Sequence, residues 1–173
     1  MNKAFRSALF SFVIIVIFMN AKADASALSK VYDNGFRDLK WGDSSNTLGE
    51  EYVLIVKDTI ETGQLFAMYY KKNEINELGG SCVETIIYAF YDDKFTTISI
   101  IYDKENWDKV NSGLIAEYGR PHASKANYSL WATDRIGMEL IVDNMGKTCA
   151  TIGRYTQEDL KSISSSLSDS PAP

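Results

Sequence analysis

The stretch of residues 78–102 constrains the fold of this chain more than any other part. Two runs rich in β-branched and aromatic side chains, residues 83–91 and 95–102, flank the polar turn sequence Asp92-Asp93-Lys94. Runs of this composition on either side of a short polar turn predict a β-hairpin. Because both runs are long, we expect this hairpin to form the centre of an antiparallel sheet.

The register of the hairpin follows from the faces of its strands. Alternate side chains of a strand point to opposite faces, so a shift by one residue moves a whole set of side chains to the other face. A loop with an odd number of residues keeps the bulky side chains together on one face, which we expect to be the core. This register pairs Phe90 with Thr96, Tyr88 with Ile98 and Ile86 with Ile100.

Other β-prone segments extend the sheet. We expect further strands or extended segments at residues 36–41, 52–57, 65–72, 128–132, 137–142 and 148–155. Short turns join most of these strands, and helices do not alternate with them. The sequence therefore predicts an α+β fold with two layers, in which a mainly antiparallel sheet has one long and one short helix packed on one face.

The expected helices have apolar residues at helical spacing. Residues 104–118 follow Asp103, which can cap a helix, and they end before Gly119, which can terminate one. Their apolar side chains form one stripe along the helix. A shorter helix after Thr156 would place Leu160, Ile163 and Leu167 on one side.

The N-terminus predicts export. Residues 1–6 are basic, residues 8–19 are apolar, and small residues follow around Ala23 and Ala25. This is the order of a secretory signal peptide. As a helix the apolar run would cover about 18 Å, which is less than the roughly 30 Å of a bilayer core. We therefore expect residues 1–23 to be a signal peptide, cleaved after Ala23 or Ala25, with no membrane insertion of the mature chain.

The mature chain is expected to be one acidic domain that is periplasmic or secreted. Residues 24–35 would be a flexible lead-in, residues 36–167 a single domain, and residues 168–173 a disordered tail. Removing the three cationic side chains of the signal peptide changes the formal net charge from −5 to −8. Nucleic-acid binding needs a basic surface, so this acidity argues against a nucleic-acid partner.

Two cysteines in an exported protein can form a disulfide. Cys82 and Cys149 both follow glycine-containing turns, at the start of predicted strands. A bridge between them would close a loop of about 67 residues, worth roughly 4 kcal/mol if the effect is chain entropy. The alternative is two buried free thiols that pack as small apolar residues. The choice depends on whether the two strands lie close together.

Candidate catalytic and metal-binding groups are few. His122 is the only histidine, and no G-x-S-x-G sequence supplies a nucleophilic serine. No Cys or His cluster has zinc-site spacing. The pair Asp92-Asp93, and Asp103 with Glu105, lack the spacing of a calcium-binding loop and fit a turn and a helix start instead. We therefore expect no metal and no cofactor.

Aromatic side chains on the sheet offer a candidate binding surface. Many of the tyrosine and phenylalanine residues must form the core. Others would fall on the second face of the sheet and could form an apolar groove for a peptide or a small ligand. This candidate binding face consists of Tyr70, Tyr91 and Phe95.

Three motifs occur in one order along residues 36–142. Residues 36–42 read F-R-D-L-K-W-G, residues 88–95 read Y-A-F-Y-D-D-K-F, and residues 114–121 read L-I-A-E-Y-G-R-P, with Trp131 after them. Together they resemble small exported bacterial proteins of unknown function that open with F-R-G-I-x-W-G and contain a Y-x-F-Y-x-x-K-F hairpin. Asp38 replaces the glycine of the first motif. The resemblance implies a bacterial exported protein and no particular activity.

The expected function is that of a non-catalytic binding or interaction module. Its sheet would bind a protein, a peptide or a small ligand outside the cytoplasm. One alternative is a small hydrolase that uses carboxylates such as Glu84, Asp92 and Asp93, which requires two acids to converge in one pocket with perturbed pKa values. A second alternative is a structural accessory of envelope assembly, which would stay bound to its partner instead of exchanging.

Overall fold

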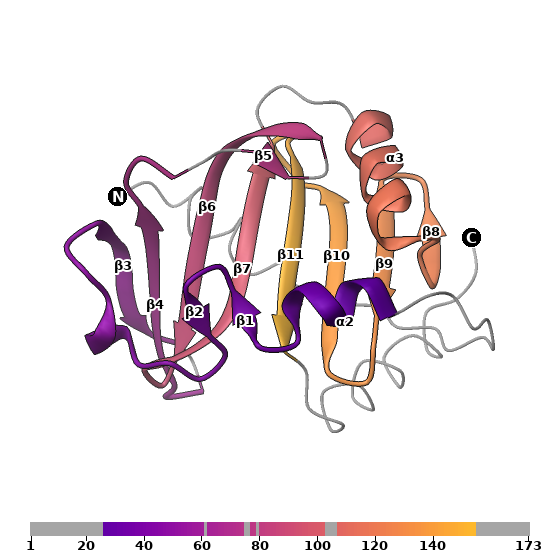
Figure 1. Cartoon of the computed structure of the whole chain (residues 1–173). Coiled ribbons are helices and arrows are strands. Elements are labelled where there is room, and N and C mark those ends of the chain that lie inside the picture. Colours follow the sequence, from indigo (N-terminus) through magenta and orange to yellow (C-terminus); the bar gives the residue numbers. More distant parts are fainter. Residues whose placement is uncertain (1–25, 61, 75–76, 79, 103–106, 155–173) are drawn as a thin grey trace.

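The computed structural model describes residues 26–60, 62–74, 77–78, 80–102 and 107–154. Its main feature is one antiparallel sheet with the strand order β3-β4-β6-β7-β11-β10-β9-β8, in which β5 also pairs with β6 (Figure 1). The strands are β3 (Tyr52–Thr59), β4 (Leu65–Lys71), β5 (Glu77–Leu78), β6 (Ser81–Tyr91), β7 (Lys94–Tyr102), β8 (Ala123–Lys125), β9 (Tyr128–Ala132), β10 (Ile136–Val142) and β11 (Thr148–Arg154).

The sheet joins two meanders. Strands β3 to β7 form the first and β8 to β11 form the second, and the final strand β11 pairs with β7 in the middle of the sheet. The predicted antiparallel sheet is confirmed, and so is the coarse α+β class. Every strand expected from residue 52 onward is present, with ends within about two residues of those expected, which is the usual disagreement at element boundaries.

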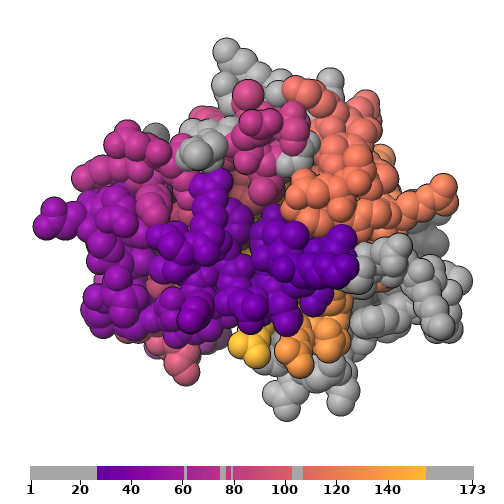
Figure 2. All heavy atoms as spheres, in the orientation of Figure 1, coloured from indigo at the N-terminus to yellow at the C-terminus, as the bar shows by residue number. Residues whose placement is uncertain are grey.

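Two helices and a small hairpin lie over one face of the sheet, which we call the core face. They are α2 (Ser26–Tyr32), the hairpin of β1 (Gly35–Phe36) and β2 (Leu39–Lys40), and α3 (Trp107–Tyr118). Figures 1 and 2 show these N-terminal elements and α3 side by side in front of the strands. A short 3-10 turn, η1 (Ser45–Thr47), follows the hairpin. The opposite face of the sheet is called the second face.

Helix α3 packs on the core face through the predicted apolar stripe. Val110, Leu114 and Tyr118 are spaced by four residues and are at most 3% exposed. Successive residues at this spacing lie on one side of a helix, so all three reach the core. They join one cluster with sheet residues such as Ile98 and Met138.

The expected flexible lead-in is wrong for residues 26–32, which form α2. Leu28 and Tyr32 are 1% and 2% exposed and belong to the main core cluster. Tyr32 also accepts a hydrogen bond at its carbonyl oxygen from Trp41 Nε1 at 2.6 Å. The helix is held by these tertiary contacts. The predicted signal peptide, the predicted helix after Thr156 and the predicted tail lie outside the described residues.

The central hairpin has the predicted register over most of its length but not the predicted loop. Tyr88 pairs with Ile98 and Ile86 with Ile100, as expected. Tyr91, however, pairs with Lys94, so the loop has the two residues Asp92 and Asp93, both with positive φ. Such a turn matches the twist of the strands. A bulge then restores the register, because Phe90 pairs with Phe95 and Ala89 with Thr97.

The two aspartates of this turn hold neighbouring segments. Asp92 accepts hydrogen bonds from the Leu65 amide at 3.0 Å and from Gln64 Nε2 at 3.1 Å. Asp93 accepts a bond from the Ser45 amide at 3.1 Å and bonds from the hydroxyls of Ser44 and Ser45. The turn therefore ties both the start of β4 and the η1 segment to the hairpin.

Acidification is expected to weaken the attachment of the η1 segment. Hydrogen bonds from Ser44 and Ser45 hold the pKa of Asp93 below its ordinary value. The stabilisation is therefore present above the pKa of the unfolded chain and is lost as the pH falls through the lower folded-state pKa. Urea denaturation should show Asp93→Asn less stable than wild type at pH 7, with the gap closing toward pH 3. Asp134→Asn, at an exposed carboxylate, is the control, and a gap that persists at low pH would contradict this assignment.

Candidate functional site

The second face carries an apolar patch where β3, β4 and β6 lie side by side. Phe66, Met68 and Ala89 are 5% to 9% exposed, and partly buried apolar side chains surround them. Phe66 and Tyr91 pair across the strands, with ring centroids 5.0 Å apart. The apolar patch consists of Val56, Ile60, Phe66, Met68, Ile87, Ala89 and Tyr91.

Tyr70 extends the apolar patch toward solvent. It pairs with Ile87 across β4 and β6, and 38% of its surface is exposed. A tyrosine in this position presents a large ring to water together with a polar hydroxyl, which is typical of residues at binding interfaces. Two members of the predicted binding face, Tyr70 and Tyr91, therefore lie where the sequence placed them.

Phe95 does not belong to this face, and that part of the prediction is wrong. It is 1% exposed and lies in the core, stacked on Trp41 with the ring centroids 4.8 Å apart. The reason is the bulge at Thr96, which adds one residue to β7 and turns Phe95 to the core face. Counting alternate side chains along β7 back from Ile98 places Phe95 on the second face, because such a count does not reveal the bulge.

Strand β3 forms the free edge of the sheet beside the apolar patch. Among the described residues it pairs only with β4. A bulge between Leu54 and Val56 interrupts that pairing, and Leu54 and Ile55 are 48% and 41% exposed. The bulge explains why two consecutive apolar side chains both reach solvent. Unpaired backbone groups and exposed apolar side chains therefore occur together at this edge.

A polar network joins the β1–β2 turn to the core face. Arg37 forms an ion pair with Glu74, whose side chain is only 6% exposed. Glu74 also accepts a hydrogen bond from the hydroxyl of Tyr88, a fully buried residue. Burial and the neighbouring carboxylate raise the pKa of Tyr88 well above its ordinary value. The phenol therefore stays protonated and acts as a hydrogen-bond donor.

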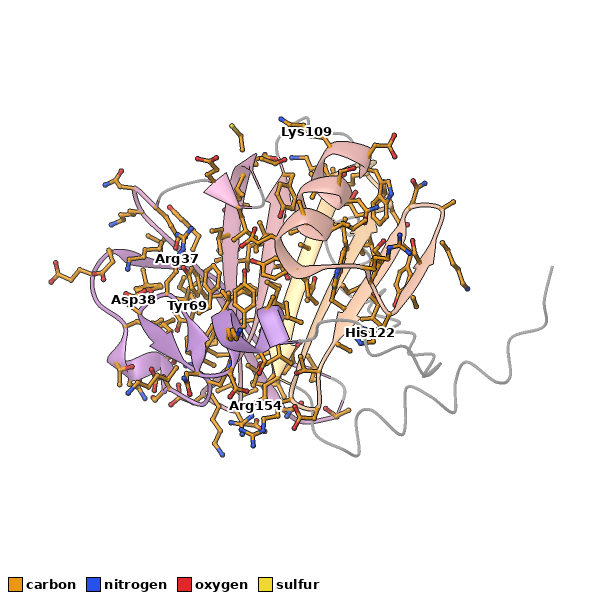
Figure 3. All side chains as sticks on the ribbon, turned by 45° about the vertical axis from the view of Figure 1, so that its right-hand side comes forward. Arg37, Asp38, Tyr69, Lys109, His122 and Arg154 are labelled. Atoms are coloured by element: carbon orange, nitrogen blue, oxygen red, sulfur yellow. The ribbon has the colours of Figure 1, made fainter. Side chains whose placement is uncertain are left out.

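A second group of charges lies beside this network. Lys71 Nζ donates to Asp38 at 2.7 Å and stands over the ring of Tyr52, 5.0 Å from its centroid. The Tyr52 hydroxyl donates to the same carboxylate at 3.1 Å. Burial alone would raise the pKa of Asp38, but these donors bring it below its ordinary value. Figure 3 shows Arg37 and Asp38 together at one side of the molecule.

These polar groups hold the β1–β2 hairpin in place, and neither of their two carboxylates is left without partners. The carboxylates of Asp38 and Glu74 each have a cation and a tyrosine hydroxyl as partners. Arg37 itself has a positive φ of 56°, as expected at the tip of a tight turn. Sequence reasoning missed Glu74 because it lies in a polar loop, and only the folded chain brings that loop to the β1–β2 turn.

The candidate hydrolase carboxylates do not converge. Glu84 is near the start of β6 and pairs with Lys147, whereas Asp92 and Asp93 follow the other end of that strand. At about 3.3 Å per residue, the two aspartates lie roughly 25 Å from Glu84.

His122 lies on the side of the molecule opposite Arg37 and Asp38 (Figure 3). It accepts a hydrogen bond from the Ala132 amide at 3.1 Å.

The described residues contain no cluster of His, Cys, Asp and Glu side chains that could hold a metal ion. Asp103 and Glu105 lie outside the residues that the structure describes. Within that same part of the chain, no helix is long and apolar enough to cross a membrane.

Both cysteines are free thiols in the structure. Cys82 lies on β6 and Cys149 on β11, and β7 runs between these strands. Two strand spacings amount to about 10 Å, whereas the Cα atoms of a disulfide lie less than about 7 Å apart. The predicted disulfide is therefore not formed. Burial, with the nearby Asp143 carboxylate, raises the pKa of the Cys149 thiol to about 12, while Cys82 is exposed.

Fold and surface together define a small sheet domain with one helical layer and an exposed apolar edge. A comparison with domain families matches residues 34–161 to the TP0088 domain, and the chain belongs to this family. The matched range contains all the motifs that resemble small bacterial proteins. No curated protein and no solved structure matches the sequence.

Proposed function

We propose that the mature chain is an exported, non-catalytic interaction module that binds an extended, apolar segment of another protein. The binding surface is Tyr70 with the adjoining free edge of β3, beside the apolar patch. The signal-peptide pattern of residues 1–23 supports export. The finer expectation of a periplasmic or secreted location rests on the same pattern.

One observation carries this proposal. Leu54, Ile55 and Tyr70 are exposed apolar side chains, and all three lie on the outermost two strands of the sheet. Leu54 pairs with Tyr69 and faces the core side of the sheet, whereas Tyr70 pairs with Val53 on the second face. An extended partner that adds its backbone to the edge of β3 would place alternate side chains on both faces, against Leu54 on one and toward Tyr70 on the other. An exposed apolar surface beside an unpaired strand edge is otherwise a liability that stable proteins avoid.

The charged side chains on β3 limit where along this strand a partner can pair. Lys57 and Asp58 lie on the second half of the strand and discourage indiscriminate pairing there. The first half, from Tyr52 to Ile55, has no charged side chain. The partner segment is therefore expected to be short and apolar at its centre. A structural accessory of envelope assembly would use the same surface and differ in remaining bound.

Tyr70→Glu is expected to lower partner capture. A photo-reactive cross-linker placed at Lys72, on the exposed surface next to Tyr70, is used to recover partners of the full chain after export. Sequencing the N-terminus of the recovered chain tests whether the signal peptide was cleaved. Tyr70→Glu and Leu54→Glu should each lower recovery of a specific partner tenfold or more, because a charge then replaces an apolar contact. Tenfold corresponds to about 1.4 kcal/mol.

Met145→Glu is the matched control for this experiment. Met145 is 74% exposed and lies in the turn between β10 and β11, away from the apolar patch. It should leave recovery unchanged. Equal recovery from wild type, Tyr70→Glu and Leu54→Glu would contradict the proposal. Recovery that falls equally for Met145→Glu would show a general effect of added charge and would also count against this surface.

A further inference from the structure

The free edge of β3 has a sequence that is complementary to itself in the antiparallel direction. Residues 52–55 form its uncharged half, the exposed acids Glu50 and Glu51 precede them, and the exposed Lys57 follows. When two copies of such a strand run antiparallel, the acidic end of each lies beside the basic end of the other, and the apolar centres meet. Opposite charges across a strand pair stabilise that pair. The edge therefore fits a second copy of itself.

The backbone groups that point outward from this edge lie in the uncharged half. The Lys72 amide donates to the Glu51 carbonyl oxygen at 2.8 Å, so the backbone groups of Glu51 point toward β4. Because successive residues of an antiparallel strand alternate in direction, the groups of Val53 also point to β4, and those of Tyr52 and Leu54 point to the free edge. The Tyr52 amide already donates to a carbonyl oxygen of its own turn at 3.0 Å. The Tyr52 carbonyl oxygen and the Leu54 amide are therefore the groups that a second strand can use.

We propose that two copies of the chain pair antiparallel along β3, with Val53 on the two-fold axis, and that this pairing closes the partner-binding edge until a partner displaces the second copy. The closing of the edge rests on the proposed function, because it names what covers that surface in the absence of a partner. The Leu54 amide of each copy donates to the Tyr52 carbonyl oxygen of the other. Closed two-fold dimers are the commonest oligomers of soluble proteins. An uncovered strand edge otherwise invites uncontrolled pairing with other chains.

The bulge in β3 brings opposite charges together in this register. Val53 pairs with Tyr70 of β4. Lys57 pairs with Ala67, which is three residues along β4 from Tyr70, so the bulge leaves Lys57 three strand positions beyond Val53. Glu50 lies three residues before Val53. Rotation about an axis at Val53 therefore places Lys57 of each copy opposite Glu50 of the other, once on either side of the axis.

Asp58 does not cancel this attraction. It pairs with Phe66 of the apolar patch and so points to the second face. Lys57 points to the core face through its pairing with Ala67. The Asp58 carboxylate accepts a hydrogen bond from the Thr59 amide at 2.8 Å. The acid and the base at this end of β3 therefore lie on opposite faces of the sheet.

Disulfide trapping tests the position of the axis. In a chain with both native cysteines replaced by serine, Val53→Cys should form a covalent dimer under a mild oxidant. The two copies of residue 53 then form a non-hydrogen-bonded pair with Cα atoms about 4.5 Å apart, which a disulfide can span. Thr59→Cys, on the same edge and also exposed, is the matched control, because its two copies lie roughly 33 Å apart in this register. Its dimer should form about tenfold more slowly or slower still. Equal rates for the two variants would overturn the proposal.

An exchange of charges tests the register independently. Analytical ultracentrifugation of the purified protein measures the dimer dissociation constant, which should rise about tenfold in Lys57→Glu and in Glu50→Lys, since a repulsion replaces each attraction. The double variant exchanges the two charges and should return the constant to within about threefold of wild type. Lys125→Glu, on β8 at the opposite edge of the sheet, should leave it unchanged (Figure 1). A protein that is monomeric at every concentration, or a double variant that dimerises no more tightly than the single variants, would contradict the proposed pairing.

Partner recovery separates this inference from the proposed function. The oxidised Val53→Cys dimer should recover about tenfold less partner than the reduced protein, because the second copy then stays on the edge. Unchanged recovery from the oxidised dimer would show that the pairing does not close the edge. Recovery that depends on Tyr70 in a protein that stays monomeric would refute the second copy and leave the proposed function standing. A dimer that recovers no partner in either state would confirm the pairing and contradict the proposed function.

Discussion

Phe95→Ala is expected to lower the free energy of unfolding by about 3–5 kcal/mol, the usual cost of deleting a buried aromatic ring. Phe95 is 1% exposed and stacks on Trp41, with further ring contacts to Tyr88 and Phe90. The substitution leaves a cavity at the centre of this aromatic cluster. Guanidinium denaturation of the protein measures the loss.

Tyr70→Ala is the matched control for Phe95→Ala. The sequence placed both residues on one face, but 38% of Tyr70 is exposed. Its loss should therefore cost about 1 kcal/mol or less. Similar losses for the two variants would mean that the bulge at Thr96 is absent and that Phe95 lies on the second face. This comparison tests the register of the hairpin directly.

Trp131→Ala is expected to cost about 3–5 kcal/mol as well. Trp131 is 2% exposed on the core face, and its Nε1 donates to the carbonyl oxygen of Gly119 at 2.8 Å. Gly119 ends α3 with a φ of 80°. The indole therefore fills the core and satisfies a carbonyl at the helix terminus, where intrahelical donors are lacking.

Trp131→Phe separates the two roles of this side chain. It keeps most of the apolar contact and removes the hydrogen bond, so we expect a loss of about 1–2 kcal/mol. The same denaturation experiment measures both variants. A loss for Trp131→Phe as large as that for Trp131→Ala would show that the bond to Gly119, and not packing, dominates.

The regular parts of the fold could be predicted from the sequence. The central pairs Tyr88–Ile98 and Ile86–Ile100 follow from alternation, and α3 follows from its stripe of Val110, Leu114 and Tyr118 together with its terminal glycine. These patterns are local, so a few consecutive residues are enough to define them. The sequence also placed Tyr91 of the apolar patch, and the adjoining Tyr70, on the second face of the sheet.

The features that the sequence did not show depend on tertiary contacts. A single extra residue at Thr96 moves Phe95 to the core, and no local signal distinguishes a bulge from a longer loop. Helix α2 is short, and its burial against Trp41 and α3 stabilises it. The partnership of Arg37 with Glu74 joins two loops that are remote in sequence.

The place of β11 beside β7 has a consequence for how the protein is made. The two strands that meet at the centre of the sheet are separated in sequence by α3 and strands β8 to β10. A chain emerging from its N-terminus therefore exposes the edge of β7 until the last strand arrives. Contacts between such distant segments slow folding. Under the proposed export, slow closure of the sheet would leave the newly synthesised chain unfolded long enough to pass through an export channel.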